Sequence, residues 1–303
     1  MNYNELWHQL APLYGDGEAK AIAQMVYEVR YGLSLSDIYL GKDTQLSADC
    51  QAELEEIAKR LADHEPVQYV LGVADFCGRT FHVEPGILIP RPETEHLCRL
   101  IIERANSQKP MANGQKILDI GTGSGCIAIT LALDIPDSHV TAWDISPTAL
   151  RVAKANAERL GAQVNVEQVD VLSPPSFRRG MGGGSSFKGM RGGSSFKGMR
   201  GGFSLIVSNP PYICDSEADQ MEANVLDYEP ALALFVPDDD PLKFYRAIAG
   251  LGQRMLNEGG WLYFEINPLY VNELCELLRT MSYHDINIHE DQFGKQRFIR
   301  GQR

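Results

Sequence analysis

The sequence predicts an α/β protein in which helices cover both faces of a largely parallel sheet, with a small helical domain in front of it. Three observations lead to this prediction: short apolar runs alternate with amphipathic segments from Lys116 onward, the first run enters a glycine-rich turn, and residues 1–66 carry apolar side chains at helical spacing. Alternation of this kind is typical of β-α-β units, whose crossover helices pack back on the sheet.

The first domain, residues 1–66, is expected to consist of helices that pack on one another. Two apolar stripes recur at helical spacing, namely Ile22, Met25, Val26 and Val29, then Leu54, Ile57, Ala58 and Leu61. Ser47 is the expected N-cap of the helix that carries the second stripe. Such stripes usually form a core, so they indicate helix packing and leave open whether another face binds a partner.

Residues 67–90 are predicted to form a linker with a β-hairpin, because short β-type segments alternate there with glycines, at Gly72, Gly78 and Gly86. The second domain, 91–303, opens with a helix in which proline and acidic residues precede the apolar residues Leu97, Leu100 and Ile101. Strands are expected at 116–120, 139–144, 164–171, 203–208 and 260–266. Helices are expected at about 126–134, 147–160, 241–256 and 268–280, and the tail, about 285–301, is predicted to form two closing strands.

One stretch, about 178–202, departs from this pattern. The nonapeptide GGSSFKGMR at 183–191 recurs unchanged at 192–200, and no acidic residue lies between Arg178 and Gly202. This composition predicts a flexible insert between two strands, where a longer loop adds little closure cost. Its positive charges could contact RNA or another acidic partner, but an insert without a function is the simpler interpretation.

The bulk composition excludes several classes of protein. A net charge of −12 argues against a broad nucleic-acid-binding face, although it is compatible with a basic protein partner. No apolar stretch reaches the roughly 18 residues of a membrane span, and the first residues resemble no signal peptide, so no membrane association is expected. The cysteines form no CxxC pair and the histidines no HExxH motif, so we expect no metal site, no disulfide framework and a cytoplasmic location.

A candidate ligand site follows the first strand, 116–120, as Gly121-Thr122-Gly123-Ser124-Gly125. Glycines allow close backbone approach to a ligand, and the next helix presents free N–H groups. Cys126-Ile127 excludes a phosphate-binding loop of the GK[ST] type, and the spacing is not that of the GxGxxG dinucleotide fingerprint. The glycine turn alone is therefore a weak signal.

Asp144 strengthens it, because it ends the next strand, where a carboxylate can hold both hydroxyls of a ribose. The alternative role for Asp144 is an N-cap of the helix that begins near Pro147. Asp170-Val171 closes the third predicted strand, where the edge of an adenine would lie, but Asp170 can equally be a solvated turn residue.

The most informative motif is Asn209-Pro210-Pro211-Tyr212, directly behind the apolar run 203–208 and thus at the carboxyl edge of a strand. The prolines fix φ and remove backbone donors, leaving the Asn209 side chain and bare carbonyl oxygens. Such a turn suits a substrate NH2 group, because it supplies acceptors and no base. The alternatives are that Asn209 merely forms the turn and that Tyr212 is a core aromatic.

In combination, the glycine turn, Asp144 and the tetrapeptide resemble class I S-adenosylmethionine-dependent methyltransferases that act on an exocyclic or amide nitrogen. With the segment Ile89–Glu95, the block Leu118–Gly125 and the helical first domain, the chain is similar to the HemK/PrmC family, the peptide chain release factor N5-glutamine methyltransferases. The resemblance covers essentially the whole chain except about 176–202.

The resemblance implies a Rossmann-like sheet, S-adenosylmethionine as cofactor and, as acceptor, the glutamine of a Gly-Gly-Gln loop in release factors 1 and 2, docked on residues 1–66 of a monomer. It implies catalytic roles for Asn209, Pro210 and Tyr212. The implied cofactor-binding residues are Gly121, Thr122, Gly123, Ser124, Gly125, Asp144, Asp170, Val171 and Asn209. The implied substrate-binding residues are Leu88, Arg91, Asn209, Pro210, Pro211 and Tyr212.

Two other functions remain open at this point. The same tetrapeptide would serve methylation of adenine N6 or of a ribosomal-protein glutamine, although adenine enzymes need a target-recognition region and usually a basic cleft. The chain could also be a binding module for S-adenosylmethionine without catalysis. Glu265, at the end of the strand 260–266, is expected to be structural.

Overall fold

The computed structural model describes residues 1–107, 114–173, 177–179, 185–187 and 202–303. The chain divides into two compact units, each described separately below. The helical unit comprises Met1–Ala74, Val83–Pro85 and Met221–Glu229, and the sheet unit comprises the remaining segments, Asp75–His82, Gly86–Gln220 and Pro230–Arg303.

Buried apolar stripes hold the helical unit together. Its elements are α1 (Tyr3–Tyr31), α2 (Leu35–Tyr39), the 3-10 helix η1 (Lys42–Gln45), α3 (Ala48–Ala62), α4 (Val67–Leu71) and α8 (Ala223–Tyr228). Ile22 and Val26 of α1 pack in one core with Leu54 and Leu61 of α3, as the helical spacing predicts. Val29 was predicted to share this stripe but does not join the core and is 46% exposed.

Hydrogen bonds fix the ends of α3. The Ser47 side chain accepts from the backbone N of Cys50 at 3.3 Å, which confirms the predicted N-cap. At the other end, the Tyr14 hydroxyl donates to the Leu61 carbonyl and the Tyr228 hydroxyl to the Asp63 carbonyl, both at 2.7 Å. A segment far along the chain therefore helps to satisfy the free carbonyls of this helix end.

The expectation of β-type structure from residue 67 is wrong for the first five residues. Val67–Leu71 form α4, which starts after Pro66 and ends at Gly72 in the left-handed conformation. The hairpin follows, as β1 (Val73–Phe76) and β2 (Arg79–His82). Its two-residue turn, Cys77 and Gly78, has positive φ at both positions (48° and 70°), the geometry that matches the twist of tight hairpins.

The sheet unit is built on seven strands in the order β12-β13-β11-β8-β3-β4-β5. These are β3 (Lys116–Ile120), β4 (His139–Asp144), β5 (Val164–Gln168), β8 (Phe203–Ser208), β11 (Leu256–Glu265), β12 (His284–Glu290) and β13 (Gln296–Gln302). The five from β5 to β11 are parallel neighbours, while β13 is antiparallel to both β11 and β12. The sheet and its two closing strands confirm the predicted α/β architecture.

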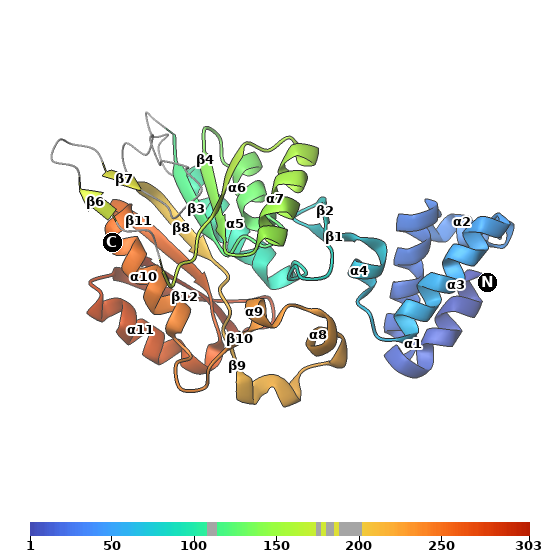
Figure 1. Cartoon of the computed structure of the whole chain (residues 1–303). Helices are drawn as coiled ribbons and strands as arrows, with labels where there is room; N and C mark the ends of the chain where they lie inside the picture. The colour runs from blue at the N-terminus through green and yellow to red at the C-terminus, as the bar shows by residue number, and fades with distance from the viewer. Residues whose placement is uncertain (108–113, 174–176, 180–184, 188–201) are drawn as a thin grey trace. The chain divides into compact units, whose positions relative to one another are not determined.

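Helices cover both faces of this sheet (Figure 1). On one face lie α10 (Lys243–Met255) and α11 (Val271–Thr280), whose apolar residues pack on Ile206, Leu262 and Phe264. On the other lie α5 (Pro92–Ser107), α6 (Cys126–Asp134) and α7 (Pro147–Leu160), which cover Leu205 and Val207. Successive side chains of β8 therefore enter two different cores, as expected for a central strand.

Shorter elements complete the sheet unit. They are β6 (Phe177–Arg179), β7 (Ser185–Phe187), β9 (Ile213–Cys214), the 3-10 helix η2 (Asp215–Gln220), α9 (Ala231–Leu234), β10 (Phe235–Val236) and the 3-10 helix η3 (Pro268–Tyr270). β6 and β7 pair antiparallel with each other. The predicted flexible insert, about 178–202, otherwise lies outside the described residues.

Two findings bear on the excluded classes of protein. Within the described ranges, no helix combines the length and apolar character needed to cross a membrane. All six cysteines carry free thiols.

Candidate active site

The glycine turn after β3 is shaped by two different steric demands. Gly125 caps α6 with φ 83°, and a Cβ there would lie 2.9 Å from the Ile129 side chain and 3.2 Å from Ala153 Cβ, so only glycine permits this packing. Gly121 and Gly123 also have positive φ, but a Cβ on Gly123 would meet no atom within 4 Å, and one on Gly121 only the Asn209 carbonyl oxygen at 3.9 Å. The space next to the backbone of Gly121 and Gly123 is therefore open.

Asp144 ties the end of β4 to this turn. Its Oδ2 atom accepts a hydrogen bond from the Gly123 backbone N at 2.9 Å, and its Oδ1 atom one from the Ser146 backbone N at 2.9 Å. Ser146, and not Asp144, caps α7, because its hydroxyl accepts from the Ala149 N. Burial raises the pKa of Asp144, while these backbone donors act to lower it.

Asp170 and Val171 lie just beyond β5 and not at its end as predicted. The strand stops at Gln168. Val169 N still donates to the Asp144 carbonyl of the neighbouring strand, and Ser173 N then donates to the Asp170 carbonyl, which turns the chain. The Asp170 side chain accepts from Leu172 N at 2.9 Å. The turn role considered for Asp170 is therefore real, and the residue also faces the pocket described below.

The tetrapeptide at the end of β8 is joined to the strand beside it. The Ser208 hydroxyl donates to the Ile120 carbonyl at 2.7 Å, which links the carboxyl ends of β8 and β3. Directly after it, the Asn209 Nδ2 atom lies 3.3 Å from Thr94 Oγ1 on α5. Pro210 is buried and Pro211 half-buried, so the corner is held rigidly beside the glycine turn.

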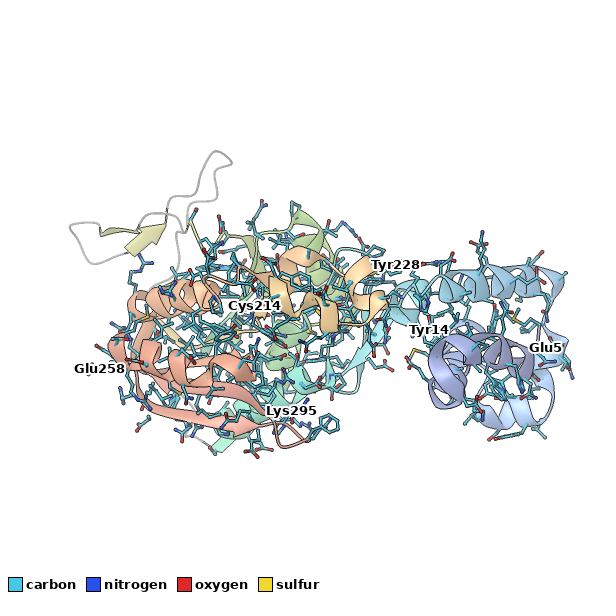
Figure 2. The ribbon with its side chains drawn as sticks, turned by 90° about the horizontal axis from the view of Figure 1, so that it is seen from below. Glu5, Tyr14, Cys214, Tyr228, Glu258 and Lys295 are labelled. Carbon is cyan, nitrogen blue, oxygen red and sulfur yellow. The ribbon has the colours of Figure 1, made fainter. Side chains whose placement is uncertain are left out.

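Tyr212 turns its hydroxyl to Glu265, donating to Oε1 at 3.1 Å, and its carbonyl accepts from Asn267 Nδ2 at 3.1 Å. Burial raises the pKa of Tyr212, while the charges of Arg297 and Arg91 act to lower it. The next buried residue, Cys214, lies among the packed side chains of the sheet unit in Figure 2, with its Sγ atom 3.2 Å from the Tyr270 hydroxyl.

One pocket brings most of the predicted site residues together. Leu88, Gly121, Gly123, Asp144, Asp170, Val171, Asn209, Pro210 and Pro211 all line it. The other five predicted site residues are not among those that line it, namely Thr122, Ser124, Gly125, Arg91 and Tyr212. Apolar side chains complete the wall, including Ile145, which is 45% exposed, and Leu232, which is 63% exposed.

Sequence reasoning assigned no role to Asp119 and expected Glu265 to be structural without identifying its partners. Asp119 is completely buried in β3, accepts from the Thr122 hydroxyl at 2.6 Å, and has its pKa raised to about 7, chiefly by burial. Glu265 is 2% exposed at the end of β11 and accepts from both Thr94 and Tyr212. The available signal was an acidic residue inside an otherwise apolar strand, which burial makes costly unless it is paired.

The described residues were also compared with the requirements of a metal site. Across the described residues, no group of three or more His, Cys, Asp or Glu side chains is arranged to hold a metal ion. The pocket combines open glycine backbone, the half-buried carboxylates of Asp144 and Asp170, and a corner of hydrogen-bond acceptors. This combination fits a nucleoside-bearing ligand beside a substrate that carries N–H donors.

The sheet order and this pocket define a class I methyltransferase. Residues 112–179 match the model of a methyltransferase domain, and residues 8–72 match the PrmC N-terminal domain. Of the solved structures, the 16S rRNA N2 G1207 methyltransferase of T. thermophilus, in complex with AdoMet and guanosine, superposes with a TM-score of 0.50 at 16% identity. That superposition covers 76% of this chain and 49% of that one, and shows the shared fold.

Full-length relatives narrow the class. The chain is 46% identical to the release factor glutamine methyltransferase of Bacteroides thetaiotaomicron, over 97% of this chain and 96% of that protein. It is 36% identical to the protein of the same name from Flavobacterium psychrophilum, over 99% and 97% of the two chains. The chain therefore belongs to the release factor glutamine methyltransferase family, which confirms the resemblance inferred from its motifs.

A methyltransferase domain implies S-adenosylmethionine as the methyl donor, and the residues present fit that molecule. The open space next to Gly121 and Gly123 permits close backbone approach. Asp144 is hydrogen-bonded to this turn and lines the same pocket. Apolar residues such as Ile145 and Leu172 also line the pocket.

Proposed function

We propose that this chain transfers a methyl group from S-adenosylmethionine to the side-chain amide nitrogen of the glutamine in the Gly-Gly-Gln loop of peptide chain release factors 1 and 2. The observation that carries the proposal is that Asn209, Pro210 and Pro211 line the same pocket as Gly121 and Asp144. The hydrogen-bond acceptors of the tetrapeptide and the proposed nucleoside-binding residues therefore line the same pocket. The names of the family relatives support release factors as the protein substrates.

In this proposal the pocket acts by positioning. S-adenosylmethionine, when bound, supplies an activated methyl group on a sulfonium sulfur. The amide nitrogen is a poor nucleophile, because its lone pair is delocalised into its carbonyl. The Asn209 side-chain oxygen and the Pro210 carbonyl each accept one N–H of the substrate amide and turn its nitrogen toward the methyl group. Such orientation is worth up to roughly 7–11 kcal/mol in well-aligned systems.

The same acceptors favour the transition state over the ground state. As the new bond forms, the substrate N–H groups become more acidic, and hydrogen bonds from them strengthen. No side-chain base is needed before attack, and the proton leaves to water afterwards. Tyr212 packs at the corner and helps to exclude water, and Leu88 and Arg91 help to wall the glutamine side.

The remaining cofactor contacts are assigned to the turn and the strand ends. Gly121 and Gly123 meet the methionine part through their backbone, with Thr122, Ser124 and Gly125 holding the turn in shape. Asp144 holds the ribose hydroxyls, and Asp170 and Val171 lie at the adenine edge.

The helical first domain, residues 1–66, docks the release factor, with 67–90 as linker and 91–303 as the methyltransferase domain. The chain acts as a monomer in the cytoplasm, where release factors work and where its six free thiols stay reduced. Sedimentation of the chain alone and with release factor 1 tests this stoichiometry; a stable dimer of the free chain would contradict it.

The direct experiment compares acceptors. Purified chain and labelled S-adenosylmethionine are incubated in parallel with release factor 1, release factor 2, ribosomes and duplex DNA. We expect label in both release factors and in neither of the other two. Label confined to ribosomes or DNA would favour the ribosomal-glutamine or adenine alternative, and donor binding without any transfer would favour a non-catalytic module.

A further inference from the structure

A continuous chain of hydrogen bonds runs behind Asn209. Asn209 Nδ2 lies 3.3 Å from Thr94 Oγ1, Thr94 Oγ1 lies 2.7 Å from Glu265 Oε2, and the Tyr212 hydroxyl lies 3.1 Å from Glu265 Oε1. Three separate elements contribute: the first turn of α5, the corner after β8 and the end of β11. Because Thr94 is 3% and Glu265 2% exposed, water contributes little to satisfying these groups.

The direction of each hydrogen bond follows from what each group can donate. Burial raises the pKa of Glu265, while the hydroxyls of Thr94 and Tyr212 and the charge of Arg297 act to lower it. The proposal takes Glu265 in its ionised form, which only accepts, so both hydroxyls donate to it. The single hydroxyl hydrogen of Thr94 is thereby used, and toward Asn209 its oxygen can only accept. An Asn209 amide turned the other way would place two acceptor oxygens against each other at hydrogen-bond distance, which is unfavourable in a buried site.

We propose that Thr94, held by Glu265, is a positioning residue that fixes the orientation of the Asn209 side-chain amide. With the NH2 group committed to Thr94, the Oδ1 atom is the one presented to the pocket. The inference rests on the proposed function, because an acceptor at this position matters when the substrate brings an NH2 group. The reversed amide would offer N–H donors to the N–H donors of the substrate.

This role is not assigned by the tetrapeptide itself. A free asparagine side chain interconverts its two orientations by rotation about χ2, and the tetrapeptide contains no group that chooses between them. The choice comes from a residue 115 positions earlier in the chain. Thr94 therefore supplies selectivity for a donor substrate without touching that substrate.

The test replaces the hydroxyl and keeps the shape. Thr94→Val removes both the acceptor for Asn209 and the donor to Glu265, Thr94→Ser keeps both, and Thr94→Ala serves where valine is not accommodated. Thr130→Val is the matched control, because Thr130 is fully buried on α6 and its hydroxyl has no hydrogen-bond partner within the described part of the chain.

Three quantities are measured for each variant: kcat and KM for release factor, and the dissociation constant of S-adenosylmethionine. We expect Thr94→Val to lower kcat about 10- to 100-fold, the effect of one lost hydrogen bond to a buried polar group, with the two binding constants within about threefold of the parent. Thr94→Ser and Thr130→Val should keep parent kcat within about threefold. Parent kcat in Thr94→Val, or an equally slow Thr94→Ser, would overturn the proposal.

A spectroscopic readout separates this proposal from the proposed function. The side-chain NH2 protons of Asn209, assigned by their loss in Asn209→Asp, should exchange slowly with solvent in the parent and in Thr94→Ser and quickly in Thr94→Val. If these exchange rates are observed but the parent chain methylates no release factor, the proposed function is wrong and the proposed orientation of Asn209 stands. An active parent whose Asn209 protons exchange equally fast in all variants would sink the orientation alone.

Discussion

The Asp144 carboxylate accepts a hydrogen bond from the backbone N of Gly123 at 2.9 Å, so the end of one strand holds the turn that follows its neighbour. Both residues line the pocket. The carboxylate thus has two tasks in the proposed site: it fixes the glycine turn and it is available to ribose hydroxyls.

Replacing Asp144 should therefore weaken donor binding more than chemistry. We expect Asp144→Ala to raise the dissociation constant of S-adenosylmethionine about 10- to 100-fold, as for the loss of hydrogen bonds to a charged group, while kcat at saturating donor falls less. Titration calorimetry and steady-state kinetics check this. Unchanged donor affinity would remove Asp144 from the cofactor site.

The glycine turn offers a matched pair of substitutions. Gly123 and Gly161 both have positive φ (54° and 72°), and at both a Cβ would meet no atom within 4 Å. Alanine at either site should cost about 1–2 kcal/mol of folding stability, because the left-handed conformation is unfavourable with a Cβ.

Only Gly123→Ala should also weaken the binding of S-adenosylmethionine, since the alanine side chain would occupy space that the donor needs. Gly161, at the end of α7, lies outside the lining of the pocket. Donor affinities that change equally in the two variants would show that the open space at Gly123 has no special role.

Asn209→Ala should have the opposite effect to Asp144→Ala, slowing methyl transfer while leaving donor binding nearly unchanged. We expect kcat to fall at least about 100-fold, the range seen when one preorganised hydrogen-bonding group of an active site is removed, with donor affinity within a few-fold. Asn165→Ala, on the exposed side of β5, is the control. An unchanged kcat would exclude Asn209 from the mechanism.

Asp119 predicts a dependence of stability on pH. Its pKa rises from 3.8 to about 7 in the folded chain, so between these values the native state keeps a proton that the unfolded state has lost. The contribution is therefore fully present below the unfolded pKa and is lost as the pH rises through about 7. The free energy of unfolding should fall by up to about 1.4 kcal/mol per pH unit from this group.

Urea unfolding between pH 5 and 8 measures this slope. Asp144, Glu167 and Glu265 also have raised pKa values and contribute in the same direction, so the informative quantity is the difference between parent and Asp119→Asn. The variant should lose stability less steeply with rising pH. Parallel curves for the two chains would show that Asp119 stays ionised when the protein folds.

Much of the fold could be predicted because the pattern is local. Apolar runs ended by Gly, Asp or Asn place the strand ends, and proline and acids mark the start of α5. Two errors have local causes that the apolar pattern did not indicate. Val67–Leu71 form a helix between Pro66 and Gly72, and β5 ends before the turn in which Ser173 N donates to the Asp170 carbonyl.

The candidate site was predictable only in part, because some of its hydrogen bonds join distant segments of the chain. Residues at or just after strand ends, such as Asp144 and Asn209, can be recognised in the sequence, because parallel strands bring their carboxyl ends to one edge of the sheet. Thr94 and Glu265 do not. Their relation to Asn209 is a hydrogen-bond chain between elements more than a hundred residues apart, and no spacing rule in a single sequence encodes it.

The most direct test of the central claim is mass spectrometry of release factor peptides after incubation with the chain and isotope-labelled S-adenosylmethionine. The account predicts a single labelled methyl group on the side-chain nitrogen of the glutamine in the Gly-Gly-Gln loop, absent when Asn209→Ala replaces the parent. Label on any other residue, or an unmodified loop despite tight donor binding, would contradict it.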